Sequence, residues 1–136
     1  MTNTAPPDPH RTEIKVRFYE LDPYDHLNHT IYVAYFETAR IEFLESVGFG
    51  LGRLNEMGFR IVVSQIEVDF MAPVIHGDRV VVETAVVENR RASSRWHQRM
   101  YRDGEMVAEL RLRAAITDVA GKPARFPEEL RIALES

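Results

Sequence analysis

The sequence contains no cysteine among its 136 residues. Disulfide bonds, thiolate metal sites and cysteine nucleophiles are therefore excluded as sources of stability or chemistry. The absence of cysteine fits a reducing compartment, and a cytoplasmic location is the default expectation.

Long apolar runs and an excess of basic residues are also missing. No apolar segment approaches the roughly 20 residues that a membrane-spanning helix needs, and the polar, proline-rich residues 1–11 lack the apolar centre of a signal peptide. The net charge is −4 and the isoelectric point is about 5.7. We therefore expect no membrane and no nucleic acid as partner, because both favour a broadly basic face. A local basic patch for one phosphorylated ligand is still compatible with this charge.

The length of the chain fits one domain. We expect residues 1–12 to form a flexible tail and residues 13–136 to form a single domain without repeats or an internal linker.

Hydrophobic periodicity predicts a strand, one long helix and then four more strands. The helix covers about residues 30–47, where apolar residues recur at spacings of three and four, and Asn28 or Thr30 can cap it. The alternating segments are residues 13–19, 66–70, 78–88, 94–101 and 106–118, and a short helix is expected after Pro127.

These elements predict an α+β fold. Long antiparallel strands form a sheet whose apolar face must be covered, and only the helix at 30–47 is long and apolar enough to cover it. The expected architecture is one curved antiparallel sheet wrapped around one central helix.

The segment at 18–40 carries a family resemblance. It is similar to the signature [Y/F]-x-D-x-D-x-x-G-H-x-N-N, followed by a helix that reads x-x-Y-x-x-[Y/F]-x-E-x-A-R. This signature opens the 4-hydroxybenzoyl-CoA thioesterase-like group of hotdog-fold proteins, and residues 19–48 especially resemble 1,4-dihydroxy-2-naphthoyl-CoA thioesterases. The matching residues are Phe18, Glu20, Asp22, His26, Asn28, Tyr32, Tyr35, Phe36, Glu37, Ala39 and Arg40.

The resemblance covers about residues 13–125 and is weaker downstream, at 70–84. It implies the hotdog fold, hydrolysis of an acyl-CoA thioester without a cofactor, and a homodimer or homotetramer whose active sites lie between subunits. Asp25 stands where the family usually has glycine, and His29 replaces the second asparagine of the signature. Aspartate tolerates the left-handed conformation better than most residues, so the loop can be retained.

The resemblance assigns catalysis to the loop and the helix start. Asp22 is expected to act as nucleophile or general base, with His26, Asn28 and His29 completing the site. Backbone N–H groups around residues 28–30 are unpaired donors at the positive end of the helix dipole and can polarise the thioester carbonyl. The structural alternative for Asp22 is a role in an ordinary turn, since aspartate side chains accept hydrogen bonds from nearby backbone amides.

Other residues are assigned to binding or to structure. Tyr32 is expected to contact substrate, and the basic turn between two strands is expected to bind CoA through Arg90, Arg91, Ser93 and Arg95, although a solvated turn is an alternative. Glu20 fits a structural carboxylate, as His26 fits a structural histidine. Glu37 and Arg40, three residues apart, fit an intrahelical or dimer-interface ion pair.

Two alternatives remain open at this stage. Asp22, Asp25, His26 and His29 have side chains that suit zinc or iron, but the related thioesterases need no metal, and none is expected. The rival functions are a non-catalytic acyl-CoA sensor and a hydrolase of acyl carrier protein thioesters. The residues do not identify the acyl group.

Overall fold

The computed structural model describes residues 9–135. A 3₁₀ turn at Phe18–Glu20 precedes α1. In chain order, the strands and α-helices are β1 (His10–Lys15), α1 (His29–Ser46), α2 (Leu51–Met57), β2 (Phe59–Phe70), β3 (Arg79–Asn89), β4 (Ser93–Arg102), β5 (Glu105–Asp118) and α3 (Glu128–Glu135).

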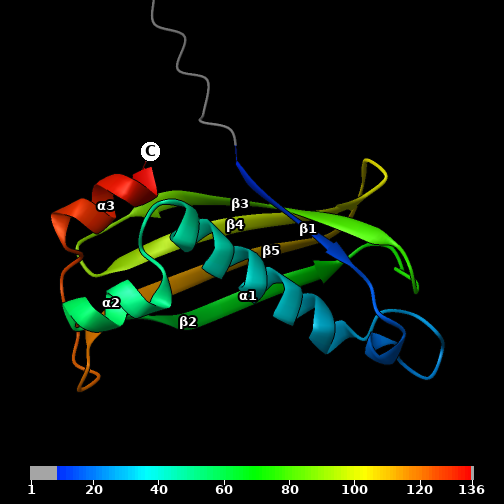
Figure 1. Cartoon of the computed structure of the whole chain (residues 1–136), viewed down its shortest axis with the longest axis horizontal. Coiled ribbons are helices and arrows are strands. Elements are labelled where there is room, and N and C mark those ends of the chain that lie inside the picture. The colour runs from blue at the N-terminus through cyan, green and yellow to red at the C-terminus, as the bar shows by residue number, and fades with distance from the viewer. Residues whose placement is uncertain (1–8, 136) are drawn as a thin grey trace, which may run out of the picture.

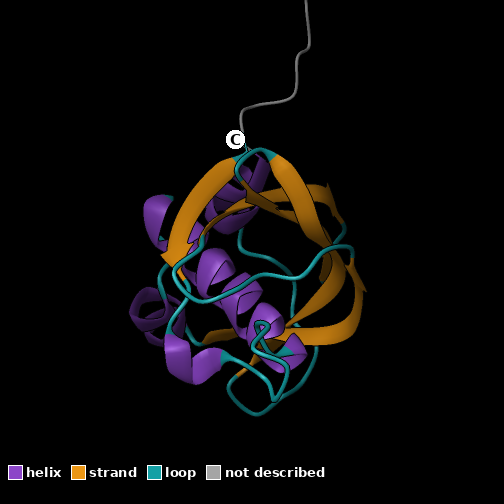
Figure 2. Ribbon diagram, turned by 90° about the vertical axis from the view of Figure 1, so that its right-hand side faces the viewer, coloured by secondary structure: helices purple, strands orange, loops and turns teal. Residues whose placement is uncertain are grey.

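The strands form one antiparallel five-stranded sheet in the order β1-β3-β4-β5-β2. The sheet curves around α1, which lies along its concave side (Figure 1), and the view turned by 90° shows the strands around the helix (Figure 2). The predicted α+β architecture is confirmed. The β4–β5 hairpin turns at Asp103-Gly104, where φ is positive at both residues, as the favoured two-residue turn requires.

The core lies between α1 and the concave face of the sheet. The apolar stripe of α1 places Phe36 and Ala39 at 0% exposure, and Phe43 packs edge-on against Trp96 with ring centroids 5.5 Å apart. On the sheet side of the core, Met100 of β4 and Leu110 of β5 are both 0% exposed. Because α1 is packed along its length, the position of its N-terminus is determined by the core.

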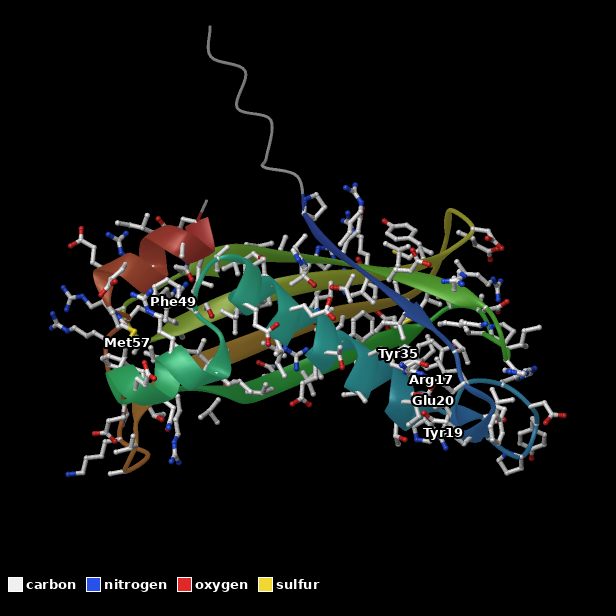
Figure 3. The ribbon with its side chains drawn as sticks, viewed as in Figure 1. Arg17, Tyr19, Glu20, Tyr35, Phe49 and Met57 are labelled. Carbon is white, nitrogen blue, oxygen red and sulfur yellow. The ribbon has the colours of Figure 1, made fainter. Side chains whose placement is uncertain are left out.

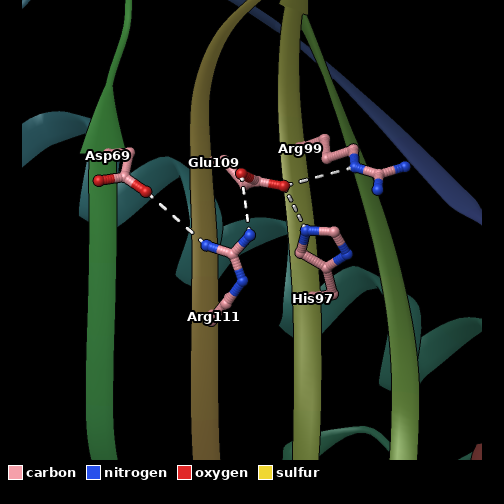
Figure 4. A network of polar contacts seen from close by, with 5 residues as sticks. All are labelled: Asp69, His97, Arg99, Glu109 and Arg111. Atoms are coloured by element: carbon pink, nitrogen blue, oxygen red, sulfur yellow. Dashed lines mark hydrogen bonds and ion pairs between the residues drawn. The ribbon is translucent and has the colours of Figure 1, made fainter.

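The convex face of the sheet carries a polar network instead (Figure 4). His97 Nε2 lies 2.6 Å from Glu109 Oε2, and Arg111 lies between Glu109 and Asp69 at 3.2 and 3.7 Å. The hydrogen bond from His97 holds the pKa of Glu109 below its usual value, against the opposing effect of burial. One face of the sheet is therefore apolar and covered, and the other is polar and faces solvent.

The structure differs from the sequence prediction at three elements. β1 covers His10–Lys15 instead of residues 13–19. Residues 10–12 therefore pair with β3 instead of belonging to a tail, and residues 18–20 form the 3₁₀ turn. α2 was not predicted, since only Leu54 of its seven residues is buried and the segment carries no apolar stripe. β2 is longer than the predicted 66–70, because a bulge near Ser64 interrupts its alternation.

No helix within residues 9–135 is long and apolar enough to cross a membrane.

The burial of Phe36 gives a test of this packing. Phe36→Ala should lower the free energy of unfolding by about 3–5 kcal/mol, because it removes a fully buried ring from the helix–sheet interface. Val119→Ala, at a residue that is 54% exposed, should change it by less than about 0.5 kcal/mol. Chemical denaturation of both variants measures the difference, and a small effect of Phe36→Ala would contradict the described core.

Candidate active site

The loop between the 3₁₀ turn and α1 is closed by its own backbone. Asp22 N–H donates to His26 O at 2.7 Å, and Leu21 forms an isolated antiparallel bridge with Leu27. Asp25 sits at the tip of the turn with φ of 61°, and its N–H donates to Asp22 O at 3.1 Å. Asp25 therefore adopts the left-handed conformation expected from the glycine that it replaces.

The carboxylate of Asp22 holds this turn together. Its Oδ1 accepts hydrogen bonds from Tyr24 N–H at 2.8 Å and His26 N–H at 3.1 Å. The turn interpretation of Asp22 is thus correct for one of its oxygens. Its Oδ2 has no hydrogen-bond partner among residues 9–135. The carboxylate is fixed through one oxygen and leaves the other available.

Glu20 ties the loop to the helix (Figure 3). Its backbone carbonyl accepts from Asn28 N–H at 3.0 Å, and its Oε1 accepts from Tyr35 O–H at 2.5 Å and Arg17 N–H at 2.8 Å. Burial is the main cause that raises the pKa of Tyr35 above its usual value, and the hydrogen bond to Glu20 raises it further. The phenol therefore stays protonated and donates this hydrogen bond. These contacts support the structural interpretation of Glu20.

The N-terminus of α1 has one amide without a partner. Asn28 is the N-cap, and its Oδ1 accepts from Thr30 N–H at 2.9 Å and Thr30 Oγ1 at 2.8 Å. The N–H of Asn28 is itself bonded to Glu20 O. Within residues 9–135, the N–H of His29 donates to no hydrogen-bond acceptor. The three candidate oxyanion donors of residues 28–30 are thereby reduced to His29.

The side chains of the other predicted residues differ in their surroundings. His26 and His29 are exposed, and the His29 ring stands edge-on to Phe70 at 6.5 Å. Tyr32, which was predicted to contact substrate, is only 4% exposed, and its hydroxyl donates to Ala72 O at 3.1 Å. Burial raises the pKa of Tyr32. Tyr32 is therefore part of the core, and its hydroxyl is hydrogen-bonded within the chain.

The predicted CoA-binding residues lie in the turn between β3 and β4. Arg90 N–H closes the turn onto Ser93 O at 2.8 Å, while its Nε lies 2.6 Å from Glu88. Arg95 Nε lies 3.8 Å from the same carboxylate. The side chain of Arg91 is exposed, and its backbone carbonyl accepts a hydrogen bond from Phe126 N–H. The hydrogen bond from Arg90 lowers the pKa of Glu88. A hollow of about 50 Å³ lies between Arg90, Ser93 and Arg95.

Within one chain, this basic turn does not reach the Asp22 loop. The start of α1 packs against Phe70, which pairs with Ala108, and Ala108 pairs with Met100. Ser93 is seven residues away along β4, or about 23 Å. The predicted catalytic and CoA-binding residues therefore occupy opposite ends of the sheet.

The structure offers no metal site in the described part of the chain. No group of three or more histidine, aspartate or glutamate side chains among residues 9–135 is arranged to hold a metal ion. The alternative drawn from Asp22, Asp25, His26 and His29 has no support in this geometry.

A large cavity lies elsewhere, between the second half of α1, α2 and the start of β2. Its volume is about 700 Å³, and Arg40, Trp96 and Ile61 are among its lining residues. It does not include the Asp22 loop of the same chain.

A curved sheet around one helix, with an acidic loop at the helix N-terminus, defines a hotdog-fold protein of the thioesterase type. The chain belongs to the thioesterase-like superfamily, which it matches over residues 16–134. This membership confirms the predicted family, and the match extends past residue 125, where the predicted resemblance ends.

Three comparisons show which known proteins the chain is similar to. The chain is 29% identical over 124 residues to the acyl-acyl carrier protein thioesterase ATL3 of Arabidopsis thaliana, with 90% of this chain and 65% of ATL3 covered, so it spans about two thirds of that relative. A Thermus thermophilus thioesterase complexed with coenzyme A and zinc is 32% identical, with a TM-score of 0.82 and 93% and 92% of the two chains covered. The 1,4-dihydroxy-2-naphthoyl-CoA thioesterase Slr0204 of Synechocystis has a TM-score of 0.85 over 92% and 94% of the chains, and at 17% identity this likeness shows the fold.

The left-handed turn gives a test of the loop. Asp25→Val should destabilise the protein by about 1–3 kcal/mol, because a β-branched residue is strained at positive φ. Asp25→Gly should stay within about 1 kcal/mol of the parent, since glycine adopts this conformation freely but loses more entropy on folding. Thermal or urea unfolding compares the two variants, and equal stabilities would contradict the described turn.

Proposed function

We propose that the protein is an acyl-CoA thioesterase, which converts RCO–S–CoA and water into a carboxylic acid and free CoA. One observation carries this proposal: two groups without a hydrogen-bond partner among residues 9–135 lie close together in the sequence. One is the free oxygen of a fixed Asp22 carboxylate, and the other is the unpaired N–H of His29 at the start of an 18-residue helix. Thioester hydrolysis needs one group of each kind.

In the general-base route, Asp22 Oδ2 removes a proton from water as the water oxygen attacks the thioester carbonyl carbon. The carbonyl oxygen becomes an oxyanion, and the His29 N–H donates to it with the support of the helix dipole. The tetrahedral intermediate then collapses, the C–S bond breaks, and the thiolate of CoA takes up the proton. In the nucleophilic route, the same Oδ2 attacks the carbonyl carbon, expels the thiolate and forms an anhydride that water hydrolyses.

The second part of the proposal is a homodimer at minimum. β2 is an edge strand of twelve residues without proline, and it exposes apolar side chains that one chain leaves uncovered: Val62, Val63, Ile66 and Phe70. An unguarded apolar edge favours pairing with another strand. Two copies joined antiparallel through β2 would cover these side chains and form one continuous sheet.

This pairing also accounts for the separation between the two predicted groups. With the twofold axis near the middle of β2, Phe70 of one chain lies level with residue 62 of its partner, and residue 62 is paired with Ala115 next to Ser93. The basic turn of one subunit is then at the same end as the Asp22 loop of the other. The active site is therefore composite, which fits CoA held by the partner's Arg90, Ser93 and Arg95.

The alternative acyl carrier is supported by the likeness to ATL3, whose name gives acyl carrier protein thioesters as its substrates. CoA is favoured because a Thermus relative, covered over nearly its whole length, is complexed with coenzyme A. A thiol-release assay with matched acyl-CoA and acyl carrier protein thioesters compares them directly. Binding without turnover of either would favour the sensor function.

Asp22→Asn is a sharp test of the carboxylate. The asparagine Oδ1 can keep the hydrogen bonds from Tyr24 and His26, so the loop is retained while the anionic oxygen is lost. We expect kcat for acyl-CoA hydrolysis to fall by about 10²–10⁴-fold. Asp25→Asn makes the same change three residues away and should keep kcat within a few-fold. Equal activity of the two variants would exclude Asp22 from the reaction.

Ile66→Lys tests the dimer. Ile66 is 41% exposed in the single chain, and a lysine there should place two charges close together across the paired strands and separate the subunits. Light scattering should report monomers, and hydrolysis should fall with dissociation because the site is composite. Val119→Lys adds the same charge on an exposed loop and should leave the dimer intact. A dimeric, fully active Ile66→Lys variant would disprove pairing through β2.

A further inference from the structure

The cavity of about 700 Å³ beside α1 has a mostly apolar lining that includes two cationic side chains, Arg40 and Arg60. The sheet contributes Trp96, Leu112 and Ala114, and β2 contributes its first residues. The volume lies in the range of pockets that bind small molecules. Arg40 projects into this setting from the middle of α1.

Arg40 is held in place from below by a buried glutamine. Its Nη1 donates to Gln98 Oε1 at 2.9 Å, and Gln98 is 0% exposed. The Gln98 amide nitrogen in turn donates to Phe36 O at 2.9 Å and Thr84 Oγ1 at 3.0 Å. The position of the guanidinium is therefore determined by the core and not by solvent.

The intrahelical ion pair, one of the two predicted alternatives for Glu37 and Arg40, is not formed, and an ion pair at a dimer interface stays a prediction. No carboxylate oxygen of residues 9–135 lies within 4 Å of the Arg40 guanidinium, although the charge of Glu37 acts on it from a longer distance. Burial lowers the pKa of Arg40 despite that charge. A guanidinium carries five N–H donors, and Gln98 is the one acceptor that the described residues offer it.

A half-buried cation without an anion loses hydration, and among residues 9–135 only Gln98 Oε1 replaces part of it. The group that would complete it is an acceptor oxygen, best an anionic carboxylate, because arginine binds carboxylates through two parallel hydrogen bonds. Arg60 also lines the cavity, but its side chain is exposed and stays hydrated. Of the two arginines, Arg40 is therefore the one whose lost hydration a bound anion would replace.

Resting on the proposed function, we propose that Arg40 determines acyl specificity by binding an oxygen at the far end of the acyl group. The substrates are thioesters whose acyl tail ends in a carboxylate or another acceptor oxygen, in preference to plain hydrocarbon tails. The β2 pairing described above places the α1 N-terminus of the partner beside residues 59–63, which border this cavity. An acyl group attached to a thioester at that helix start would extend into the cavity toward Arg40.

Matched thioesters test this specificity. Adipyl-CoA, 6-hydroxyhexanoyl-CoA and hexanoyl-CoA share a six-carbon acyl chain and differ at the terminal group. The wild type should show kcat/KM at least about tenfold higher for adipyl-CoA than for hexanoyl-CoA, as a hydrogen bond to a charged group contributes. The hydroxyl compound separates a need for charge from a need for an acceptor oxygen. Arg40→Met should bring the adipyl/hexanoyl ratio close to one, whereas Arg60→Met should leave the ratio as in the wild type.

Direct binding supplies a readout that does not depend on catalysis. Calorimetry with adipic acid monoamide and hexanamide, whose amide ends stand in for the thioester, should show the monoamide carboxylate binding to the wild type at least about tenfold more tightly, and Arg40→Met should lose this difference. Arg40→Lys, which keeps the charge and a donor for Gln98, replaces Arg40→Met if the latter does not fold, and it should lower the ratio because lysine cannot bind a carboxylate through two parallel bonds.

The outcomes separate this inference from the proposed function. Hydrolysis of all three thioesters at similar kcat/KM by the wild type would overturn the role of Arg40 and leave the thioesterase function intact. Absence of hydrolysis with selective binding of adipic acid monoamide over hexanamide would overturn the function and retain the site. A variant at Arg40 that becomes monomeric with an unchanged substrate ratio would show that Arg40 pairs with the partner subunit instead, and would also overturn the inference.

Discussion

The capped N-terminus of a buried helix is the constraint on which the rest of the structure depends. α1 is anchored by aromatic and aliphatic side chains that the sheet encloses, including Phe36 and Ala39 at 0% exposure. Asn28 caps this helix through Thr30, and the backbone of Glu20 accepts the N–H of Asn28. Because these partners use the neighbouring amides, the N–H of His29 is left unpaired among residues 9–135, and its direction is determined by the capped backbone on either side. Electrostatic catalysis depends on donors that are oriented before the charge develops.

The edge of the sheet imposes the second constraint. β2 exposes a row of apolar side chains at the only long edge that α1 does not cover in the described part of the chain. The same strand lies between the Asp22 loop at one end and the large cavity at the other. A pairing that covers the apolar row would also join these two regions from different subunits. Stability of the assembly and completion of the site would then have a single physical cause, the burial of one edge.

Much of the fold was predictable because its signals are local. The apolar spacing of Tyr32, Phe36 and Ala39 predicts a buried helix, and the Asp103-Gly104 dipeptide predicts the hairpin turn. α2 was missed because its helix is short and buries a single leucine. The start of β1 was missed because residues 10–12 follow a polar segment, and their strand conformation comes from pairing with β3. Contacts of that kind lie far apart in the sequence and leave no pattern in one segment.

The sequence indicated the residues of the candidate site but not their hydrogen bonds. The signature pointed to Asp22 and to the helix start, whereas the division of labour between the two Asp22 oxygens required the structure. The contacts of Arg40 also required the structure. Its i, i+3 spacing from Glu37 suggested an intrahelical ion pair, whereas its guanidinium donates to the buried Gln98. Gln98 gave no sequence signal of this role, because its partners lie on α1 and β3.

The most direct measurement is a crystal structure of the Asp22→Asn variant with an acyl-CoA bound and unhydrolysed. The account requires the thioester carbonyl oxygen about 2.7–3.1 Å from His29 N, with the side chain at position 22 on the open side of the carbonyl carbon, in direct contact or through one water. A thioester bound with its carbonyl turned away from the start of α1, or out of reach of position 22, would contradict the account.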